Sequence, residues 1–295
     1  MLTNAELARR VDTNDEWIRE RTGIVERRIA ESESAADMAT EAAAKALAAS
    51  GLAAGDIDLV IAATCSAENR LPGIAPVVSG RLGLGAPGAY DLNAACAGFC
   101  YALANASDAI RTGNARHILV VGVERLSDIT DWTDRSTCII FADGAGAAVV
   151  GPADCPGVGP VAWGSDGGRS DTITCLGSDP YLRMEGQAVF RWATTSLAQV
   201  GRRACELAGI TPRNLDALIL HQANLRILDS LARSLDVRDK VLARDIVDAG
   251  NTSAASIPMA MTRMLNSGEI GSGDLALLLA FGAGLTYAGQ VVRIP

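Results

Sequence analysis

The chain has 295 residues, of which 49% are hydrophobic and 20% charged, and it includes 30 glycines. This length and composition are typical of an α/β protein with two domains or one duplicated domain. A net charge of −8 argues against general nucleic-acid binding. The longest apolar runs, such as 275–281, are too short to span a bilayer, and we expect no signal peptide because polar residues interrupt the opening from Asn4 onward.

Cysteine usage indicates the redox compartment. The seven cysteines are irregularly spaced and form none of the C-x-x-C pairs typical of metal or redox sites. We therefore expect reduced thiols and a cytoplasmic enzyme.

The first half alternates helix and strand patterns after a polar opening, 3–28, that is expected to form one or two short helices and a loop. Ser34 is the predicted N-cap of a helix that Gly51 ends. The patterns predict helices over 35–49, 75–82 and from 94 to about 110, and strands over 59–63, 88–92, 117–123, 138–142 and 147–150.

A cluster of Gly, Pro and Asp at 151–159 marks the expected boundary between an N-terminal half, 1–155, and a C-terminal half, 156–295. The second half repeats the plan, with helices expected over 188–208, 225–235 and 251–265, and strands over 215–220, 275–280 and 288–294. Alternating strands and helices predict a layered α/β fold.

A weak internal repeat accompanies this plan. A small-residue helix starting at Cys96 leads to the strand at 118–121, and one starting at Asn251 leads to the strand at 275–279. The repeat suggests duplicated halves, although chance similarity between Ala/Gly-rich segments explains it equally well.

Cys96 is the first candidate for chemistry. It stands where an apolar extended run, 88–92, gives way to a small, helix-forming segment. A cysteine at a helix start meets unpaired N–H groups and the positive end of the helix dipole, which stabilise thiolate and lower the thiol pKa. Cys96 is therefore a candidate nucleophile, with a buried structural cysteine as the open alternative.

His221 and Asn251 are the other candidates. His221 ends a predicted strand, where open α/β sheets carry functional groups, and Asn251 opens a predicted helix. Each alone also fits a capping or loop residue. Together with Cys96 they form a possible nucleophile, proton-handling group and amide donor.

Other signals are weaker. His117 has no chemical partner in the nearby sequence and is expected to be structural. The segments Gly144-Ala-Gly and Gly282-Ala-Gly do not complete a dinucleotide-binding fingerprint. Arg226 and Arg233 are seven residues apart and share one helix face, which is either a solvated surface or a landing site for an acidic partner or phosphates.

Five separated motifs, taken in order, resemble those of the β-ketoacyl-[acyl carrier protein] synthase III family, the initiating condensing enzymes of the thiolase superfamily. They are Asp15-Glu-Trp-Ile-Arg with Arg21-Thr-Gly-Ile; Ala94-Ala-Cys-Ala-Gly-Phe; Phe141-Ala-Asp-Gly-Ala-Gly; His221-Gln-Ala-Asn-Leu-Arg; and Gly250-Asn-Thr-Ser-Ala-Ala-Ser-Ile-Pro, closed by Phe281-Gly-Ala-Gly-Leu-Thr. The match covers nearly the whole chain, and the motifs together are highly specific.

The resemblance implies a thiolase-like five-layered α-β-α-β-α fold built from two duplicated halves. It also implies a catalytic triad of Cys96, His221 and Asn251. Cys96 would take an acyl group from acyl-CoA, with the oxyanion held by the backbone N–H groups of Cys96 and Ala283. Malonyl-[acyl carrier protein] would then lose CO₂ and attack the acyl-Cys96 thioester, with His221 and Asn251 stabilising the enolate. The product would be a 3-oxoacyl-[acyl carrier protein] that initiates fatty acid biosynthesis, made without a metal or redox cofactor.

The same resemblance implies binding roles for CoA. Trp17 would stack on the adenine, Arg21 and Arg135 would lie near the phosphates, and Gln187 and Asn224 would line the pantetheine tunnel.

Partner contacts are implied as well. Arg191, Arg226 and Arg233 would form the basic patch that receives acyl carrier protein, so salt should weaken the encounter. In a homodimer, the loop with Leu71-Pro72 would close the partner's acyl pocket.

The sequence also departs from the family pattern. It begins at the segment equivalent to Thr3, without the family's first core strand, and 166–184 looks shorter than usual beside the pocket. Leu71 replaces a common Phe, which suggests room for a longer or branched acyl group, and Ala283 replaces a Gly. A starter-unit ketosynthase or acyltransferase of a polyketide pathway, and less strongly a non-catalytic scaffold subunit, are the alternatives.

Overall fold

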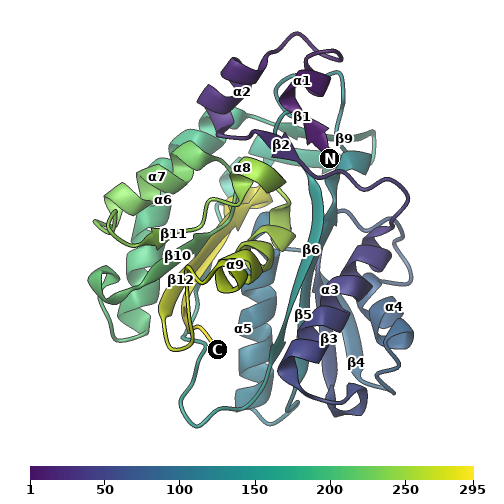
Figure 1. Cartoon of the computed structure of the whole chain (residues 1–295), viewed down its shortest axis with the longest axis vertical. Helices are drawn as coiled ribbons and strands as arrows, with labels where there is room; N and C mark the ends of the chain where they lie inside the picture. The colour runs from purple at the N-terminus through teal and green to yellow at the C-terminus, as the bar shows by residue number, and fades with distance from the viewer.

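The computed structural model describes residues 1–295 as five layers, helices alternating with sheets (Figure 1). Outer helices α3 (Ala35–Ser50) and α4 (Ile74–Arg81) cover the first sheet. Inner helices α5 (Gly98–Arg111) and α9 (Ser256–Ser267) lie between the two sheets, and α6 (Gly186–Leu207) and α7 (Leu225–Ser234) cover the second. None of the helices is both long and apolar enough to cross a membrane.

The two sheets share one strand order. The first is β4-β3-β5-β6, and the second is β11-β10-β12-β13 with β7 added at the end. Strand β3 in the first sheet and β10 in the second are each parallel to both of their neighbours. The pairs β5-β6 and β12-β13 are antiparallel. The strands are β3 (Leu59–Ala63), β4 (Gly88–Leu92), β5 (Ile118–Arg125), β6 (Asp143–Val150), β7 (Ala162–Gly164), β10 (Ala217–Leu220), β11 (Val241–Leu242), β12 (Leu275–Gly282) and β13 (Thr286–Arg293). This repeated topology confirms the prediction of two duplicated halves.

The sheets differ at one edge. Strand β7 pairs with β13, whereas the outer edge of β6 has no strand partner. The first sheet therefore has four strands and the second has five.

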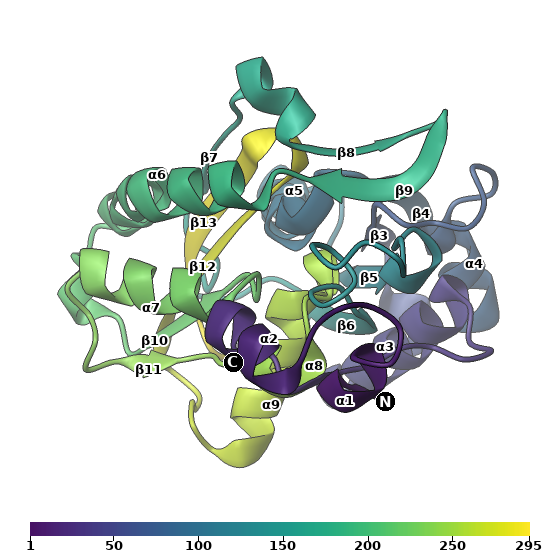
Figure 2. The ribbon, with the colours of Figure 1, turned by 90° about the horizontal axis from the view of Figure 1, so that it is seen from above.

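Shorter elements join these layers. Strand β1 (Leu2–Thr3) pairs with β2 (Glu26–Arg27), and β8 (Ile173–Leu176) pairs with β9 (Asp179–Met184) in a hairpin seen from above in Figure 2. The short helices are α1 (Asn4–Leu7), α2 (Asp15–Thr22) and α8 (Ile246–Ala249). Apolar residues of the N-terminal segment, including Leu7 and Ile18, share a core with α6 and α7, so this segment packs on the second half.

Helix α3 begins and ends where capping residues in the sequence predict. At the start of α3, Ser34 Oγ accepts a hydrogen bond from the backbone N–H of Asp37, whose carboxylate accepts one from Ser34 N–H. This capping box satisfies two donors that a helix start otherwise leaves unpaired. At the other end Gly51 adopts the left-handed conformation with φ 69°.

One strand prediction was wrong. Residues 138–140 form turns, and Phe141 only bridges to Asn251. Two backbone hydrogen bonds hold this segment, from Asn251 N–H to Ile140 O at 3.0 Å and from Ala142 N–H to Asn251 O at 2.9 Å. An apolar run therefore packs beside another loop instead of entering a sheet, which a β-pattern alone does not distinguish.

Both inner helices begin later than predicted. A 3₁₀ turn precedes each, Ala95–Ala97 before α5 and Ser253–Ala255 before α9. The first residue of each turn is left-handed, with φ 46° at Ala95 and 47° at Ser253. The duplicated halves thus repeat even this strained backbone, and both turns lie at the site described next.

Candidate active site

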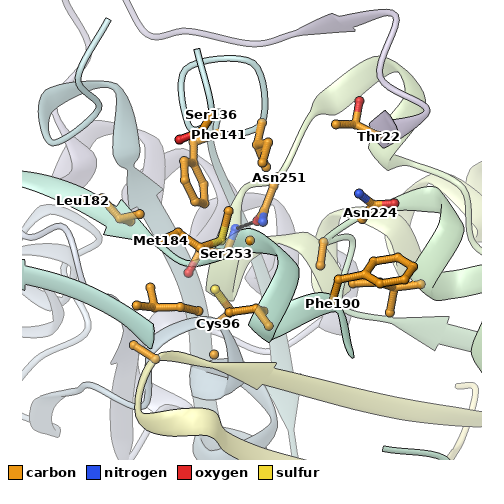
Figure 3. A pocket seen from close by; sticks show the side chains of 18 of the residues that line it. Thr22, Cys96, Ser136, Phe141, Leu182, Met184, Phe190, Asn224, Asn251 and Ser253 are labelled. Atoms are coloured by element: carbon orange, nitrogen blue, oxygen red, sulfur yellow. Dashed lines mark hydrogen bonds between the residues drawn. The ribbon is translucent and has the colours of Figure 1, made fainter. Parts of the chain in front are cut away.

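One cavity of about 1000 Å³ collects the three residues predicted to carry chemistry, Cys96, His221 and Asn251. Figure 3 shows Cys96 and Asn251 facing the same hollow, with Ser253 between them. Leu182 and Met184 lie on one side of Cys96 in that view, and Phe190 with Asn224 on the other. The three residues come from the starts of the two inner helices and from the end of β10, so the duplicated scaffold brings them together.

The Cys96 turn is held by close packing between the halves. Asn93 Oδ1 accepts a hydrogen bond from Ala95 N–H at 3.0 Å, just before the cysteine. A Cβ atom on Gly282, the last residue of β12, would lie 2.6 Å from Cys96 N, so only glycine permits this approach. The thiol is thereby fixed between the two sheets.

The pKa of Cys96 runs opposite to the sequence-based expectation. Burial raises it to about 12, outweighing the hydrogen bonds from the Ser253 hydroxyl and the backbone that act to lower it. The helix start was expected to lower this pKa, but Cys96 precedes the first residue of α5 and is withdrawn from water. The unliganded site therefore holds a neutral thiol.

Two backbone donors border the same cavity. Cys96 and Ala283 both line the cavity, and none of the turn, loop and cap hydrogen bonds to backbone carbonyls takes up their N–H groups. Backbone N–H groups that border a substrate cavity are the donors from which oxyanion holes are built.

His221 is buried, and its Nδ1 lies against a serine hydroxyl. Ser256 Oγ lies 2.8 Å from Nδ1 and also accepts a hydrogen bond from Gln222 N–H at 3.3 Å. A Ser256 hydroxyl that donates to Nδ1 would place the imidazole proton on Nε2. Burial lowers the pKa of His221 to about 3, so the ring is a neutral donor at pH 7.

Asn251 is oriented by its own turn. The backbone N–H of Ser253 donates to Asn251 Oδ1 at 2.9 Å, which leaves the Nδ2 amide hydrogens free for a ligand. Asn251 is 5% exposed and lines the cavity. The neutral ring of His221 and the amide of Asn251 thus border one space beside Cys96.

At one end of the cavity an aromatic ring lies among basic residues. The guanidinium carbons of Arg21 and Arg135 lie 4.6 and 4.9 Å from the ring centre of Trp17. All three residues line the cavity. A flat ring flanked by two cations suits a ligand that carries both a nucleobase and phosphates.

Other predicted binding residues lie nearby. Gln187, Arg191, Asn224 and Arg226 line the cavity, and Arg226 stacks on the ring of Phe190 at 5.2 Å. The Asn224 amide also has a structural role, because Oδ1 accepts from Arg226 N–H and Nδ2 donates to Arg21 O, both at 2.9 Å.

Two predicted residues lie outside the cavity. Arg233 is exposed on α7 and Leu71 is 88% exposed, and neither lines the cavity that holds the triad.

Another part of the cavity lining is apolar and lies across Cys96 from Asn224 in Figure 3. Leu126, Phe141 and Leu182 form a small buried cluster of their own, and partly buried neighbours including Met184 extend it. All of these residues line the cavity, as does Ile173 of β8, so the 166–184 segment does flank it.

Three residues that the sequence reasoning missed support the triad: Glu124, Ser253 and Ser256. The sequence could have indicated Glu124, because it is the one carboxylate in the apolar run 118–124. Glutamate is rarely fully buried unless it is paired with another group. The two serines lie in the 250–258 motif, but the motif did not show their roles, because the side chains that they contact, Glu124 for Ser253 and His221 for Ser256, lie far away in sequence.

A cysteine, a neutral histidine and an asparagine amide in one cavity of a duplicated α/β scaffold define a thiolase-like acyltransferase. The family profiles described as 3-oxoacyl-[acyl-carrier-protein] synthase III and its C-terminal part match residues 90–167 and 205–294. The chain belongs to the β-ketoacyl-[acyl-carrier-protein] synthase III family.

Individual relatives agree with this assignment. A β-ketoacyl-[acyl-carrier-protein] synthase III of Streptomyces coelicolor is 52% identical over 100% of this chain and 95% of its own. A mycobacterial β-ketoacyl-[acyl-carrier-protein] synthase III from Mycobacterium avium is 49% identical over 100% of this chain and 92% of its own.

Solved structures show the same fold. The priming β-ketosynthase of a polyketide biosynthetic pathway has a TM-score of 0.97 at 43% identity, covering 100% of this chain and 92% of that one. The 3-oxoacyl-[acyl-carrier-protein] synthase III of Aquifex aeolicus has a TM-score of 0.96 at 41% identity, covering 99% and 95%. The fold is therefore the expected thiolase-like one.

Proposed function

We propose that this chain condenses an acyl-CoA starter with malonyl-[acyl carrier protein] through an acyl-Cys96 intermediate, releasing CoA, CO₂ and a 3-oxoacyl-[acyl carrier protein]. The observation that carries the proposal is the convergence of Cys96, neutral His221 and oriented Asn251 in one cavity. The reaction would start fatty acid synthesis in the cytoplasm, where the seven cysteines, all free in the structure, stay reduced.

In the first half-reaction, Cys96 sulfur attacks the thioester carbonyl of acyl-CoA. The tetrahedral oxyanion would be held by the backbone N–H groups of Cys96 and Ala283, which both line the cavity. When the tetrahedral intermediate breaks down, CoA leaves as a thiolate and takes up the proton released from the Cys96 thiol. The acyl transfer therefore needs no other reagent.

In the second half-reaction, malonyl-[acyl carrier protein] enters and loses CO₂. The electron pair left behind forms an enolate whose oxygen would accept hydrogen bonds from His221 Nε2 and Asn251 Nδ2. Neutral donors suit this step, because each stabilises a charge that develops only during reaction. The carbanion attacks acyl-Cys96, and the cysteine sulfur leaves. Decarboxylation drives the condensation, so the reaction uses its substrates alone.

Substrate binding follows from the two ends of the cavity. The CoA adenine would stack on Trp17 with its phosphates near Arg21 and Arg135, and pantetheine would pass Gln187 and Asn224 to reach Cys96. This order places the thioester between the basic end of the cavity and the apolar end.

Carrier protein and a second subunit would bind on the outside. Arg191, Arg226 and Arg233 are exposed and would meet the acidic carrier protein. In a homodimer, the exposed Leu71 of each subunit would close the partner's acyl pocket.

The starter is expected to be longer or more branched than acetyl, because the apolar cluster of Leu126, Phe141 and Leu182 lines the cavity and Leu71 is smaller than Phe. Priming of a polyketide pathway is the second candidate, favoured by the 43% identity to the priming β-ketosynthase. Both functions share the first half-reaction and differ in the carrier protein that they use.

Intact mass spectrometry after incubation with a panel of acyl-CoA esters tests the proposal. The parent protein should gain the mass of one acyl group, while Cys96→Ala should gain none. Acetyl-CoA should label less fully than branched four- and five-carbon esters. An unlabelled parent protein that is folded would overturn the enzymatic proposal and favour a scaffold.

A further inference from the structure

Glu124 is a buried carboxylate next to the triad that the proposed reaction does not use. It stands near the end of β5 and is 0% exposed. Its two oxygens accept hydrogen bonds from the hydroxyls of Ser66 and Ser253 and from the backbone N–H of Cys65, the Ser253 bond being 2.9 Å and the shorter Cys65 bond 3.1 Å. Several donors converging on one buried acid mark a built arrangement, because an unpaired buried carboxylate is costly.

Glu124 does not itself line the cavity, although Cys65 and Ser253 do. It therefore has no access to a bound substrate, and any effect on the reaction must pass through the residues it holds. Of these, Ser253 leads directly to the triad.

Close packing places Glu124 against the Ser253 turn. Gly122 is two residues earlier on β5 and so faces the same side of the strand. A Cβ atom at Gly122 would lie 2.4 Å from Ala254 O, so the strand touches the turn backbone to backbone. The next residue on that face, Glu124, then reaches the Ser253 hydroxyl.

Ser253 itself is strained. Its φ of 47° is left-handed, a conformation that costs free energy for any residue except glycine. In this conformation its N–H donates to Asn251 Oδ1 at 2.9 Å. Without that bond the Asn251 amide would be free to rotate and present oxygen instead of N–H to the cavity.

We propose that Glu124 is a positioning residue for Asn251: its carboxylate holds the Ser253 hydroxyl, which keeps Ser253 left-handed and its N–H on Asn251 Oδ1. The contribution of Glu124 is thus conformational and acts on the second half-reaction. This inference rests on the proposed function, in which Asn251 serves malonyl decarboxylation and not the acylation of Cys96.

A matched pair of variants tests the mechanism, Ser253→Ala and Ser253→Gly. Both remove the hydroxyl, and with it the contacts to Cys96 and Glu124, so direct effects on the thiol are equal in the pair. Only glycine adopts the left-handed backbone at little cost. Malonyl decarboxylation should therefore fall about tenfold further in Ser253→Ala than in Ser253→Gly. Equal rates in the two variants would overturn the proposal.

Glu124→Gln is a second test of the proposal. It replaces one acceptor oxygen with an NH₂ donor at a position that is already surrounded by the donors of Ser66, Ser253 and Cys65. Decarboxylation should fall in Glu124→Gln and recover in part in the double variant with Ser253→Gly. The yield of acyl-Cys96 by intact mass should stay at the parent level in Glu124→Gln alone. An unchanged decarboxylation rate, or no recovery in the double variant, would contradict a conformational role. Failure of the parent to form acyl-Cys96 would instead count against the proposed function.

Discussion

The hydroxyl of Ser256 lies 2.8 Å from Nδ1 of His221, within hydrogen-bonding distance of the ring. Ser256 is the first residue of α9, the inner helix of the second half, whereas His221 follows β10 of the sheet beside it. The packing of a helix on a sheet therefore supplies the hydrogen-bond partner of the proposed enolate donor.

Removing this hydroxyl is expected to slow the second half-reaction selectively. Ser256→Ala leaves Nδ1 without the hydrogen-bond partner that would keep the proton on Nε2 in the proposed mechanism, so malonyl decarboxylation should fall roughly ten- to a hundredfold. Acylation of Cys96, measured by intact mass, should be unaffected. Ser256→Thr keeps a hydroxyl at the same position and serves as the control. If it were as slow as Ser256→Ala, packing and not the hydrogen bond would be responsible.

The two proposed enolate donors should be separable from the nucleophile. His221→Ala and Asn251→Ala are each expected to reduce condensation by about a hundred- to a thousandfold, the usual effect of losing one preorganised donor. Both variants should still form acyl-Cys96 in a single-turnover mass measurement. Loss of acylation in a folded variant would show that the residue acts in the first half-reaction as well.

Alkylation of Cys96 should depend steeply on pH. Burial raises the pKa of the thiol to about 12. Below that value the thiolate fraction grows tenfold with each pH unit, so the rate with iodoacetamide should rise without a plateau between about pH 7 and 10. Cys96→Ala supplies the background from other cysteines. A plateau near neutral pH would mean that the helix start outweighs burial after all.

Buried neutral His221 should make the protein less stable in acid. Its pKa falls from 6.5 to about 3 on folding, so below pH 6.5 the unfolded chain binds a proton that the folded chain does not. As the pH is lowered from about 6 to 3, the free energy of unfolding should then decrease by roughly 1.4 kcal/mol per pH unit. Denaturant titrations of the parent and His221→Gln would compare the slopes, and the variant should be less sensitive. Identical slopes would show that His221 is protonated in the folded state.

Charge reversal on α7 tests the carrier-protein patch. Arg233 is exposed and lies outside the cavity, so Arg233→Glu should raise KM for malonyl-[acyl carrier protein] several-fold at low salt and leave acylation by acyl-CoA intact. Lys45→Glu on α3 is a control of equal charge change, because Lys45 is 75% exposed on the opposite outer layer. Equal effects of the two reversals would indicate a response to net charge alone.

Local sequence signals determined much of the architecture. The Ser34 capping box and the left-handed Gly51 bound α3 as predicted, and the alternation of strands and helices gave the layered fold. The residue pattern also singled out Cys96, His221 and Asn251 before the structure brought them into one cavity. These features were readable because capping and periodicity act between residues a few positions apart.

Tertiary structure alone decided the state of those residues. The neutral thiol of Cys96, the neutral ring of His221 and the orientation of Asn251 depend on burial and on the contact from Ser253. The turn at 138–142 and the left-handed backbone before each inner helix likewise follow from packing between segments far apart in the chain. Desolvation and long-range packing leave no periodic trace in a sequence, so the chain predicted which groups take part, and only the fold determined their charge and orientation.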